Sequence, residues 1–266
     1  TVPLPNRTIS FEEGAAMAKA SVRVPLARPP SDGDGNAIRN KVLLILRRDE
    51  CRQILSELEL VRLKLHQVIH EAGETIKSGY FVNSGLFSVL AVQPDGKSVE
   101  VGLIGKEGFV GLPLLVGYRT SPTRVVVQAD GTAYRCSVEV LMRIVRECPE
   151  LERQLHRFAH QLSMQVTQVA ACNRLHNVEE RLARWILMSA DRLSSDNLPL
   201  TQEFLGHMLG TRRSSVTVAA GILQKAGLIY YTRGNVNVLN REGLEDAACD
   251  CYGIVQEQLK RWENDK

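Results

Sequence analysis

The residues whose chemistry is easiest to interpret lie close together in the C-terminal third of the chain. Arg212 and Arg213 stand at the start of an amphipathic segment, and Ser214, Ser215 and Thr217 follow them. A guanidinium can form two hydrogen bonds to the major-groove edge of guanine, and hydroxyl groups can reach phosphates or base edges. This combination predicts binding to double-stranded DNA, with Arg213 as the first candidate for a base contact.

The segments around these residues predict two helices joined by a tight turn, followed by a hairpin. Thr201 occupies a helix N-cap position, and apolar residues follow it at helical spacing as far as Leu209. Gly210 then interrupts the apolar run and indicates the turn. Farther on, alternating segments flank Arg233-Gly234-Asn235 and predict a two-stranded wing. The predicted DNA contacts are Thr201, Gln202, Arg212, Arg213, Ser214, Ser215, Thr217 and Arg233.

Length and composition indicate two folded domains and a local, rather than global, basic surface. The chain has 266 residues, 44% of them hydrophobic, and a formal net charge of +3. Such a chain can build two separate cores. Because no apolar run reaches about 18 residues and no export signal is visible, we expect a cytoplasmic protein without a membrane partner. The six scattered cysteines are expected to be reduced thiols.

The pattern along the chain divides it into four segments and predicts an α+β fold. Residues 1–36 are rich in proline and glycine and are expected to form a flexible extension. Residues 37–147 begin with one or two short helices. They continue as short alternating stretches separated by glycine, which predicts an antiparallel, jelly-roll-like β-roll whose mouth could hold a ligand. Residues 148–176 predict a long dimerisation helix and hinge. Residues 177–262 predict a winged helix-turn-helix domain, whose first helix Asn177 can cap.

The long helix carries an apolar stripe that advances by alternating steps of four and three residues. Sustained over three heptads, this spacing is typical of a two-stranded coiled-coil seam and favours a homodimer. The alternative is that the stripe only packs on the protein's own β-roll. The seven predicted seam residues are Leu151, Leu155, Phe158, Leu162, Gln165, Val169 and Cys172.

A β-roll, a long helix and a winged helix, in this order, resemble the Crp/Fnr family of bacterial transcription regulators over about residues 38–262. Thr201-Gln202-Glu203, Leu209-Gly210, Arg213, Val216 and Leu223 stand where that family's helix-turn-helix pattern places them. In this family the residue after the leading arginine is commonly a glutamate that reads a base. Here Ser214 stands at that position. We therefore expect an operator that differs from the best-known family half-sites.

The resemblance also implies a mechanism. An effector in the β-roll repositions the dimer helices, and the two recognition helices then fit successive major grooves about 34 Å apart. A near-palindromic operator is expected, and the bound dimer would recruit or block RNA polymerase.

The predicted effector segment departs from members of the family that bind cyclic AMP. Those members use a glutamate for the ribose and an arginine for the phosphate, whereas Leu112 and Thr123 stand at these positions here. Arg124 lies one residue later, where strand alternation turns it to the opposite face. Cyclic AMP is therefore disfavoured. The apolar character of the segment fits either a small apolar effector or a filled core, and the pocket residues considered are Gly111, Leu112, Pro113, Leu114, Thr123 and Arg124.

No metal site is predicted from the spacing of potential ligands. Oxygen-sensing relatives hold an iron–sulfur cluster through N-terminal cysteines, and the first 50 residues here contain none. Cys249 and Cys251 are one residue apart, a poor spacing for a four-cysteine cluster. His156 and His160 are four residues apart, which is more typical of a solvated helix face. An iron–sulfur cluster is therefore disfavoured, and the heptad register places Cys172 near its symmetry mate in a dimer.

Two alternatives to a signal-controlled DNA-binding regulator remain open from the sequence. In a cupin-like enzyme, closely spaced histidines and a glutamate in the roll would hold a catalytic metal. His66 and His70 lack the spacing of that motif, and we expect no enzymatic activity. A ligand-independent DNA-binding scaffold is the second alternative.

Overall fold

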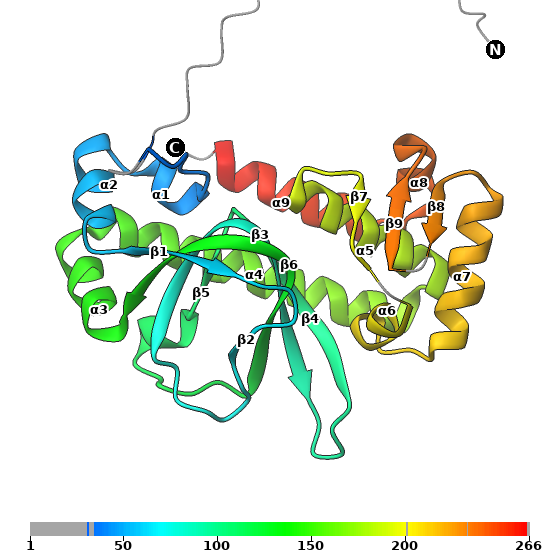
Figure 1. The fold of residues 1–266 in the computed structure, drawn as a ribbon, viewed down its shortest axis with the longest axis horizontal. Helices are drawn as coiled ribbons and strands as arrows, with labels where there is room; N and C mark the ends of the chain where they lie inside the picture. Colours follow the sequence, from blue (N-terminus) through cyan, green and yellow to red (C-terminus); the bar gives the residue numbers. More distant parts are fainter. Residues whose placement is uncertain (1–30, 32–34, 201, 233, 265–266) are drawn as a thin grey trace, which may run out of the picture.

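The computed structural model describes residues 31, 35–200, 202–232 and 234–264. The predicted extension over residues 1–36 therefore lies almost wholly outside the described residues, as do Thr201 and Arg233. The described part of the chain forms a β-roll, a pair of long helices and a winged helix, arranged along one axis (Figure 1).

The β-roll is built on two long antiparallel strands that cross its whole length. They are β3 (Ser78–Val92) and β6 (Thr123–Ser137), which pair with each other from Ser78↔Ser137 to Ala91↔Thr123. The sheet order is β1-β6-β3-β4, with β2 added to β6 and β5 added to β3. The sequence pattern indicated separate short strands on either side of Gly85. Instead, the chain continues through this glycine, which has a φ of 89°, at one of the register shifts of β3. The shorter strands are β1 (Glu59–Leu63), β2 (Val68–His70), β4 (Ser98–Ile104) and β5 (Phe109–Val110).

Short helices close one end of the roll. The expected N-terminal helices are α1 (Lys41–Ile45) and α2 (Arg48–Leu55), and α3 (Val138–Glu147) continues directly from β6. Asn40 ties α1 to the roll, because its side chain accepts a hydrogen bond from Leu43 N and donates to the carbonyls of Val82 and Gly108, each at 2.8 Å. Since the side chain is fully buried, these bonds replace those it would make with water.

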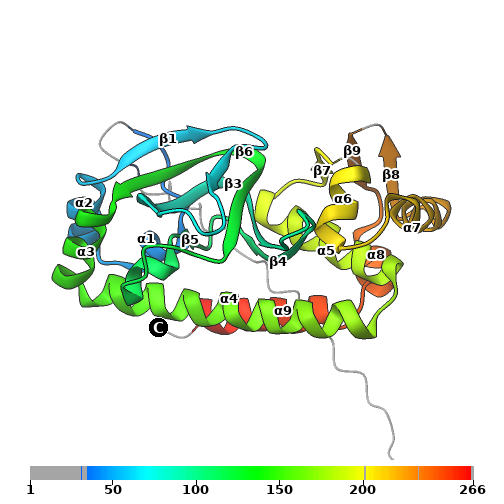
Figure 2. The same cartoon turned by 90° about the horizontal axis from the view of Figure 1, so that it is seen from below.

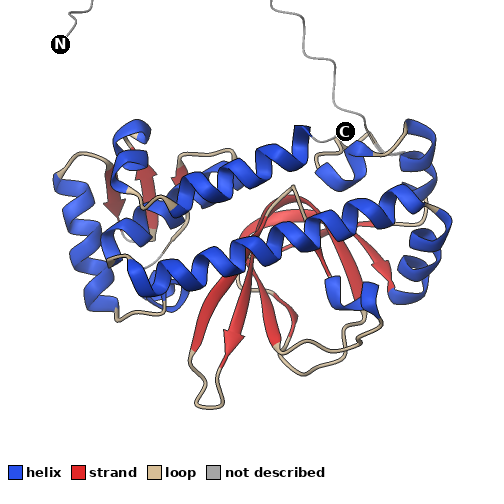
Figure 3. Cartoon of the chain, turned by 180° about the vertical axis from the view of Figure 1, so that it is seen from behind, coloured by secondary structure: helices blue, strands red, loops and turns tan. Residues whose placement is uncertain are grey.

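The long helix α4 (Pro149–Leu175) lies along the roll, and α9 (Cys251–Asn264) lies beside it (Figures 2 and 3). The indole nitrogen of Trp262 in α9 donates to Gln154 Oε1 at 3.1 Å, and its ring lies 6.2 Å from that of Phe158. The last helix of the chain, for which the sequence suggested no role, thus covers one face of α4.

This packing corrects the predicted dimer seam. Six of the seven residues are buried within the single chain, Leu151, Leu155 and Cys172 completely so, and Leu162 is half-buried against the same core. The stripe therefore faces the roll and α9, which was the alternative reading of the pattern. A core-facing helix and a coiled coil both place apolar residues at steps of three and four, so spacing alone does not separate them.

The C-terminal domain begins with α5 (Val178–Leu193). As predicted, Asn177 caps α5: it accepts from Glu180 N at 2.9 Å, and the Glu180 carboxylate accepts from Asn177 N at 3.1 Å. Three helices and a small sheet follow: α6 (Gln202–Leu209), α7 (Arg213–Lys225), α8 (Arg241–Ala247), and the strands β7 (Asn197–Leu198), β8 (Ile229–Thr232) and β9 (Asn235–Val238) in the order β7-β9-β8. Within the described residues, no helix combines the length and apolarity needed to cross a lipid bilayer.

Candidate nucleic-acid interface and signal domain

The two helices of the candidate DNA-binding motif are held together by a shared apolar core. Leu205 and Leu209 of α6 and Val216 and Leu223 of α7 are all buried in it. Gly210 forms the turn between the helices with a φ of 58°, a left-handed conformation that glycine adopts without the steric penalty of a Cβ. The predicted helix, turn and second helix are confirmed.

The outer face of α7 carries the predicted contact residues. Arg212, Arg213, Ser214 and Thr217 are exposed, and Ser215 is half-buried. Arg212 takes the N-cap position, so both arginines project from the first turn of the helix. Among the described residues neither guanidinium forms an ion pair, which leaves both charges available to a polyanion. The helix lies at the end of the molecule opposite α2 and α3 (Figure 2).

The wing is a three-stranded sheet beside α7. β8 and β9 pair from Ile229↔Val238 to Thr232↔Asn235, and β7 adds a third strand that the sequence did not indicate. The backbone nitrogen of Tyr231 donates to Gln224 Oε1 at 2.8 Å and links the wing to α7. Arg233 at its tip is outside the described residues. Gln202 begins α6, but its side chain is likewise not described.

The DNA-binding domain is joined to the β-roll by buried polar contacts. Arg192 of α5 donates from Nε to Glu107 Oε1 at 2.8 Å, with the two side chains 4% and 6% exposed. Its Nη2 donates to Gln165 of α4 at 2.7 Å. Gln165, predicted to face a partner chain, thus belongs to an internal network that joins α4, α5 and the loop after β4.

A second contact between the two domains is centred on Glu100 of β4. Its carboxyl accepts a hydrogen bond from Trp185 Nε1 at 2.7 Å and also accepts hydrogen bonds from the side chains of Ser88 and Gln128. Burial raises the pKa of Glu100 to about 7, while the hydrogen bonds from Ser88 and Trp185 and the charge of Arg184 act in the opposite direction. The contact between β4 and α5 therefore includes a carboxyl group that titrates near neutral pH.

The predicted effector segment is packed more tightly than the lining of an open pocket would be. Gly111 precedes the 3-10 helix η1 (Leu112–Val116), in which Pro113 takes the first turn and Leu114 is 2% exposed in the core of the roll. Leu112 is half-buried against the same core. The filled-core alternative is therefore favoured for Leu114.

The two β6 residues of the predicted pocket make polar contacts within the chain. Thr123 is hydrogen-bonded to Ser121, and Arg124 forms an ion pair with Glu71 at 2.6 Å. In this structure the Arg124 guanidinium is thus already matched to a carboxylate.

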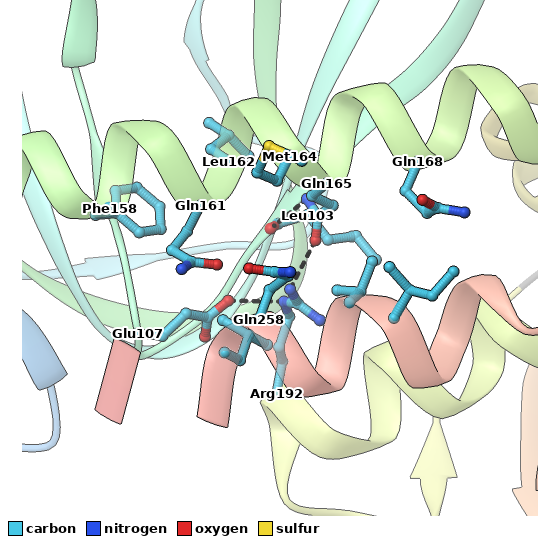
Figure 4. A pocket seen from close by; sticks show the side chains of 13 residues that line it. Leu103, Glu107, Phe158, Gln161, Leu162, Met164, Gln165, Gln168, Arg192 and Gln258 are labelled. Atoms are coloured by element: carbon cyan, nitrogen blue, oxygen red, sulfur yellow. Dashed lines mark hydrogen bonds and ion pairs between the residues drawn. The ribbon is translucent and has the colours of Figure 1, made fainter. Parts of the chain in front are cut away.

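A small cavity lies elsewhere, between α4, α9 and the roll (Figure 4). Its lining includes Leu103, Phe158, Gln165, Arg192 and Gln258, and its volume is about 30 Å³. This volume holds about two water molecules and is far too small for a nucleotide. The cavity is therefore a packing feature of the α4–α9 contact.

One group of side chains comes together only in the folded chain, because its members are far apart in the sequence. Cys172 and His176 at the end of α4 meet Cys249 and Cys251 at the start of α9; we call these four residues the cysteine–histidine cluster. Cys172 lies 3.4 Å from Cys249 of its own chain, which corrects its predicted place beside a symmetry mate. The hydrogen bond from Cys249 lowers the pKa of Cys172 and favours its thiolate. The sequence offered only two partial signals, the i, i+4 spacing of Cys172 and His176 and the close spacing of Cys249 and Cys251, and neither pair forms a ligand set alone.

Comparison with known proteins agrees with this architecture. A model of the cyclic nucleotide-binding domain matches residues 60–148, and a model of the Crp-like helix-turn-helix domain matches residues 180–247. Together they cover more than half of the chain and define a DNA-binding regulator with an N-terminal signal domain. The chain belongs to the Crp/Fnr family of transcriptional regulators, as the resemblance in the sequence indicated, and this family is not enzymatic. The cupin-like enzyme alternative is thus wrong.

Solved structures share the fold at low sequence identity. A Crp/Fnr-family regulator from Eubacterium rectale is 16% identical, with a TM-score of 0.62, and the match covers 79% of this chain and 98% of that one. The c-di-GMP-responsive regulator CLP of Xanthomonas campestris is 17% identical, with a TM-score of 0.62 and coverages of 72% and 99%. FixK2 of Bradyrhizobium japonicum is 15% identical, with a TM-score of 0.62 and coverages of 72% and 98%. No curated protein matches the chain in sequence.

Proposed function

We propose that this regulator binds a near-palindromic operator as a homodimer, with one α7 helix in each of two successive major grooves. The observation that carries the proposal is the exposed first turn of α7, where Arg212 and Arg213 have no ion-pair partner among the described residues. A helix of this kind fits the major groove, and Arg213 is the proposed reader of guanine. Ser214 and Thr217, which are exposed on the same helix, are proposed to contact phosphates or base edges beside it.

Dimerisation must use a surface other than the predicted seam, because that stripe is already buried. Regulators of this family are typically dimers. The outward face of α4 remains exposed and includes His160, Ser163, Met164 and Thr167. We propose that this face meets the partner, while the stripe containing Leu155 keeps its place against the roll. Light scattering of the purified protein tests the dimer.

The signal domain is proposed to act on α7 through the contacts between the two domains. His66, in the turn between β1 and β2, lies 6.0 Å from Phe204 of α6, measured between ring centroids. Glu100 and Glu107 contact α5 from the same side of the roll. A ligand that displaced the strands of the roll would therefore shift α5 and α6, the two helices that support α7. The dense packing around Leu114 and the replaced cyclic AMP anchors support an effector other than cyclic AMP. A regulator that binds the chromosome and recruits or blocks RNA polymerase acts in the cytoplasm.

The deciding experiment compares Arg213→Ala with Arg146→Ala, an exposed arginine on α3 at the far end of the molecule. The operator is first selected from genomic fragments with the full chain. Arg213→Ala is expected to weaken specific binding by about 1–3 kcal/mol, or about 5- to 150-fold, at constant salt, and Arg146→Ala is expected to leave it unchanged. Equal affinity of the two variants for the operator would refute the assignment of α7 as the reading helix.

A further inference from the structure

The cysteine–histidine cluster joins two parts of the chain that are more than 70 residues apart. Cys172 lies in the last turns of α4, and His176 is the C-cap residue of that helix. Cys251 is the first residue of α9, and Cys249 lies in the short connection from α8. The four potential ligand atoms, three Sγ and one imidazole nitrogen, all lie within 4.8 Å of one another.

The distances within the cluster are close to those between ligands of one metal ion. Cys172 Sγ and Cys249 Sγ are 3.4 Å apart, and Cys251 Sγ and His176 Nδ1 are 3.5 Å apart. In a tetrahedral site with Zn–S bonds of about 2.3 Å, neighbouring sulfur atoms lie about 3.8 Å apart. A disulfide requires about 2.05 Å, so all three residues are free thiols here. Small side-chain adjustments are enough to place all four groups on a zinc ion.

We propose that Cys172, His176, Cys249 and Cys251 form a structural Zn²⁺ site. Three thiolates and one imidazole are a standard tetrahedral zinc ligand set, and with four protein ligands no coordination position is left for water or substrate. The three cysteines are buried and His176 is half-buried, so the site is enclosed but reachable from one side. The proposal rests on this placement and is independent of the proposed operator and dimer.

The surroundings supply the charge that such a site needs. Zn²⁺ with three thiolates and a neutral imidazole carries a net charge of −1. Arg181 and Arg184, both buried at the start of α5, act electrostatically on Cys172 and Cys249. Within the described residues neither arginine forms an ion pair, and the Nε of each has no hydrogen-bond partner. An anionic metal centre would compensate both cations, whose burial is otherwise costly.

A hydrogen bond from a neighbouring side chain supports one of the proposed ligands. Gln168, one turn before Cys172 on α4, donates from its side-chain amide to Cys251 Sγ at 3.1 Å. Such a donor stabilises a thiolate ligand and fixes its orientation. The site therefore has a supporting hydrogen bond on the side of α4 as well as the two positive charges on the side of α5.

Zinc at this place would rigidify the junction between α4 and α5. His176 directly precedes Asn177, which caps α5, so one ligand belongs to the junction between the long helix and the DNA-binding domain. The other ligands hold the start of α9 against the end of α4. Bound zinc would thus keep α9 on α4 and restrict rotation of α5 about the junction.

The test measures metal in the full chain, purified under reducing, oxygen-free conditions and offered Zn²⁺ alone. About one Zn²⁺ per chain is expected to remain after gel filtration with a weak chelator. Co²⁺ in its place should give the visible absorption bands of a tetrahedral site with thiolate ligands. His176→Ala should lower the Zn²⁺ affinity about tenfold or more in a competition titration, and Cys249→Ala should abolish stoichiometric binding. Cys51→Ala, which removes a buried cysteine outside the cluster, is the matched control.

Three results would overturn the proposal. The first is wild-type protein that retains no Zn²⁺ although it is reduced and folded by circular dichroism. The second is a stoichiometric amount of iron and acid-labile sulfide, which would assign the same ligands to an iron–sulfur cluster. The third is Zn²⁺ binding by His176→Ala and Cys249→Ala with wild-type affinity. The cobalt spectrum of the wild-type protein keeps the test decisive if a cysteine variant does not fold.

Discussion

The indole Nε1–H of Trp185 donates a hydrogen bond to the carboxyl of Glu100 at 2.7 Å, and both side chains are buried. Trp185 belongs to the first helix of the DNA-binding domain and Glu100 to a strand of the β-roll. The two domains therefore meet through a buried polar contact rather than through apolar packing alone. Such a contact is sensitive to the protonation and identity of its members, and so the interface can be tested residue by residue.

The ionisation of Glu100 should make the stability of the protein depend on pH. Burial raises the pKa of Glu100 in the folded state from 4.5 to about 7, so the folded protein holds this proton more tightly than the unfolded chain does. The stabilisation is complete below about pH 4.5 and is lost as the pH rises to about 7, by an amount on the order of 3 kcal/mol. Urea unfolding at several pH values within this window should show the decline.

Glu100→Gln is the variant that isolates this effect, because its side chain does not titrate. Its free energy of unfolding should not decline over this pH range. The stability of the variant relative to the wild type should therefore increase as the pH rises. Glu74→Gln, at an exposed glutamate, should keep the wild-type profile. Parallel profiles for Glu100→Gln and the wild type would show that Glu100 ionises normally.

Removing both charges of the ion pair between Glu107 and Arg192 should destabilise the protein less than removing the charge of Glu107 alone. Both side chains are buried, so Glu107→Gln leaves the Arg192 guanidinium without a counter-charge and should cost about 3–5 kcal/mol in the free energy of unfolding. The double variant Glu107→Gln with Arg192→Met removes both charges and should recover a large part of this loss. If instead the two single losses simply add in the double variant, the residues are not coupled.

The attachment of α9 should depend on Trp262. This side chain is 3% exposed, packs near Phe158 and donates to Gln154. Trp262→Ala removes the contacts and the hydrogen bond together and should cost about 3–5 kcal/mol. Lys260→Ala, on the exposed side of the same helix, should change the stability by less than about 0.5 kcal/mol. Equal protection of α9 from protease in both variants would argue against Trp262 as its anchor.

Base preference should change when Ser214 is given a carboxylate. Ser214→Glu places a carboxylate on the exposed face of α7 that can accept a hydrogen bond from cytosine N4. The serine hydroxyl lacks the negative charge of this acceptor. Sequences selected from a random library should then differ from those of the wild type at one position in each half-site. Ser214→Ala is the control, and identical selections for the glutamate and alanine variants would place this residue away from the bases.

The parts of the fold that are coded by neighbouring residues were predictable. The cap of α5 by Asn177 and the turn at Gly210 depend on side chains and backbone conformations within a few residues, and both were confirmed. The exposed face of α7 followed from its helical period, because the buried Val216, Ala219, Ala220 and Leu223 recur on one face of the helix and leave Ser214 on the opposite face. The reading helix was therefore visible before any three-dimensional information.

By contrast, spacing along the chain gave a wrong prediction or no signal for contacts between segments that are distant in the sequence. The stripe through Leu155 and Gln165 has the same period whether it faces a partner or its own roll, and its true neighbours include α9, about 100 residues later. The contact of Glu100 with Trp185 has no local signature either.

The amino-acid sequence by itself determined the class of the protein, the order of its domains and the helix that carries the arginines, since helical period, caps and turns are local properties. Only the tertiary structure decided which face of α4 is buried, which polar groups join the roll to the DNA-binding domain, and that Cys172 and His176 lie beside Cys249 and Cys251. These depend on how distant segments pack, and packing is set by the whole core at once.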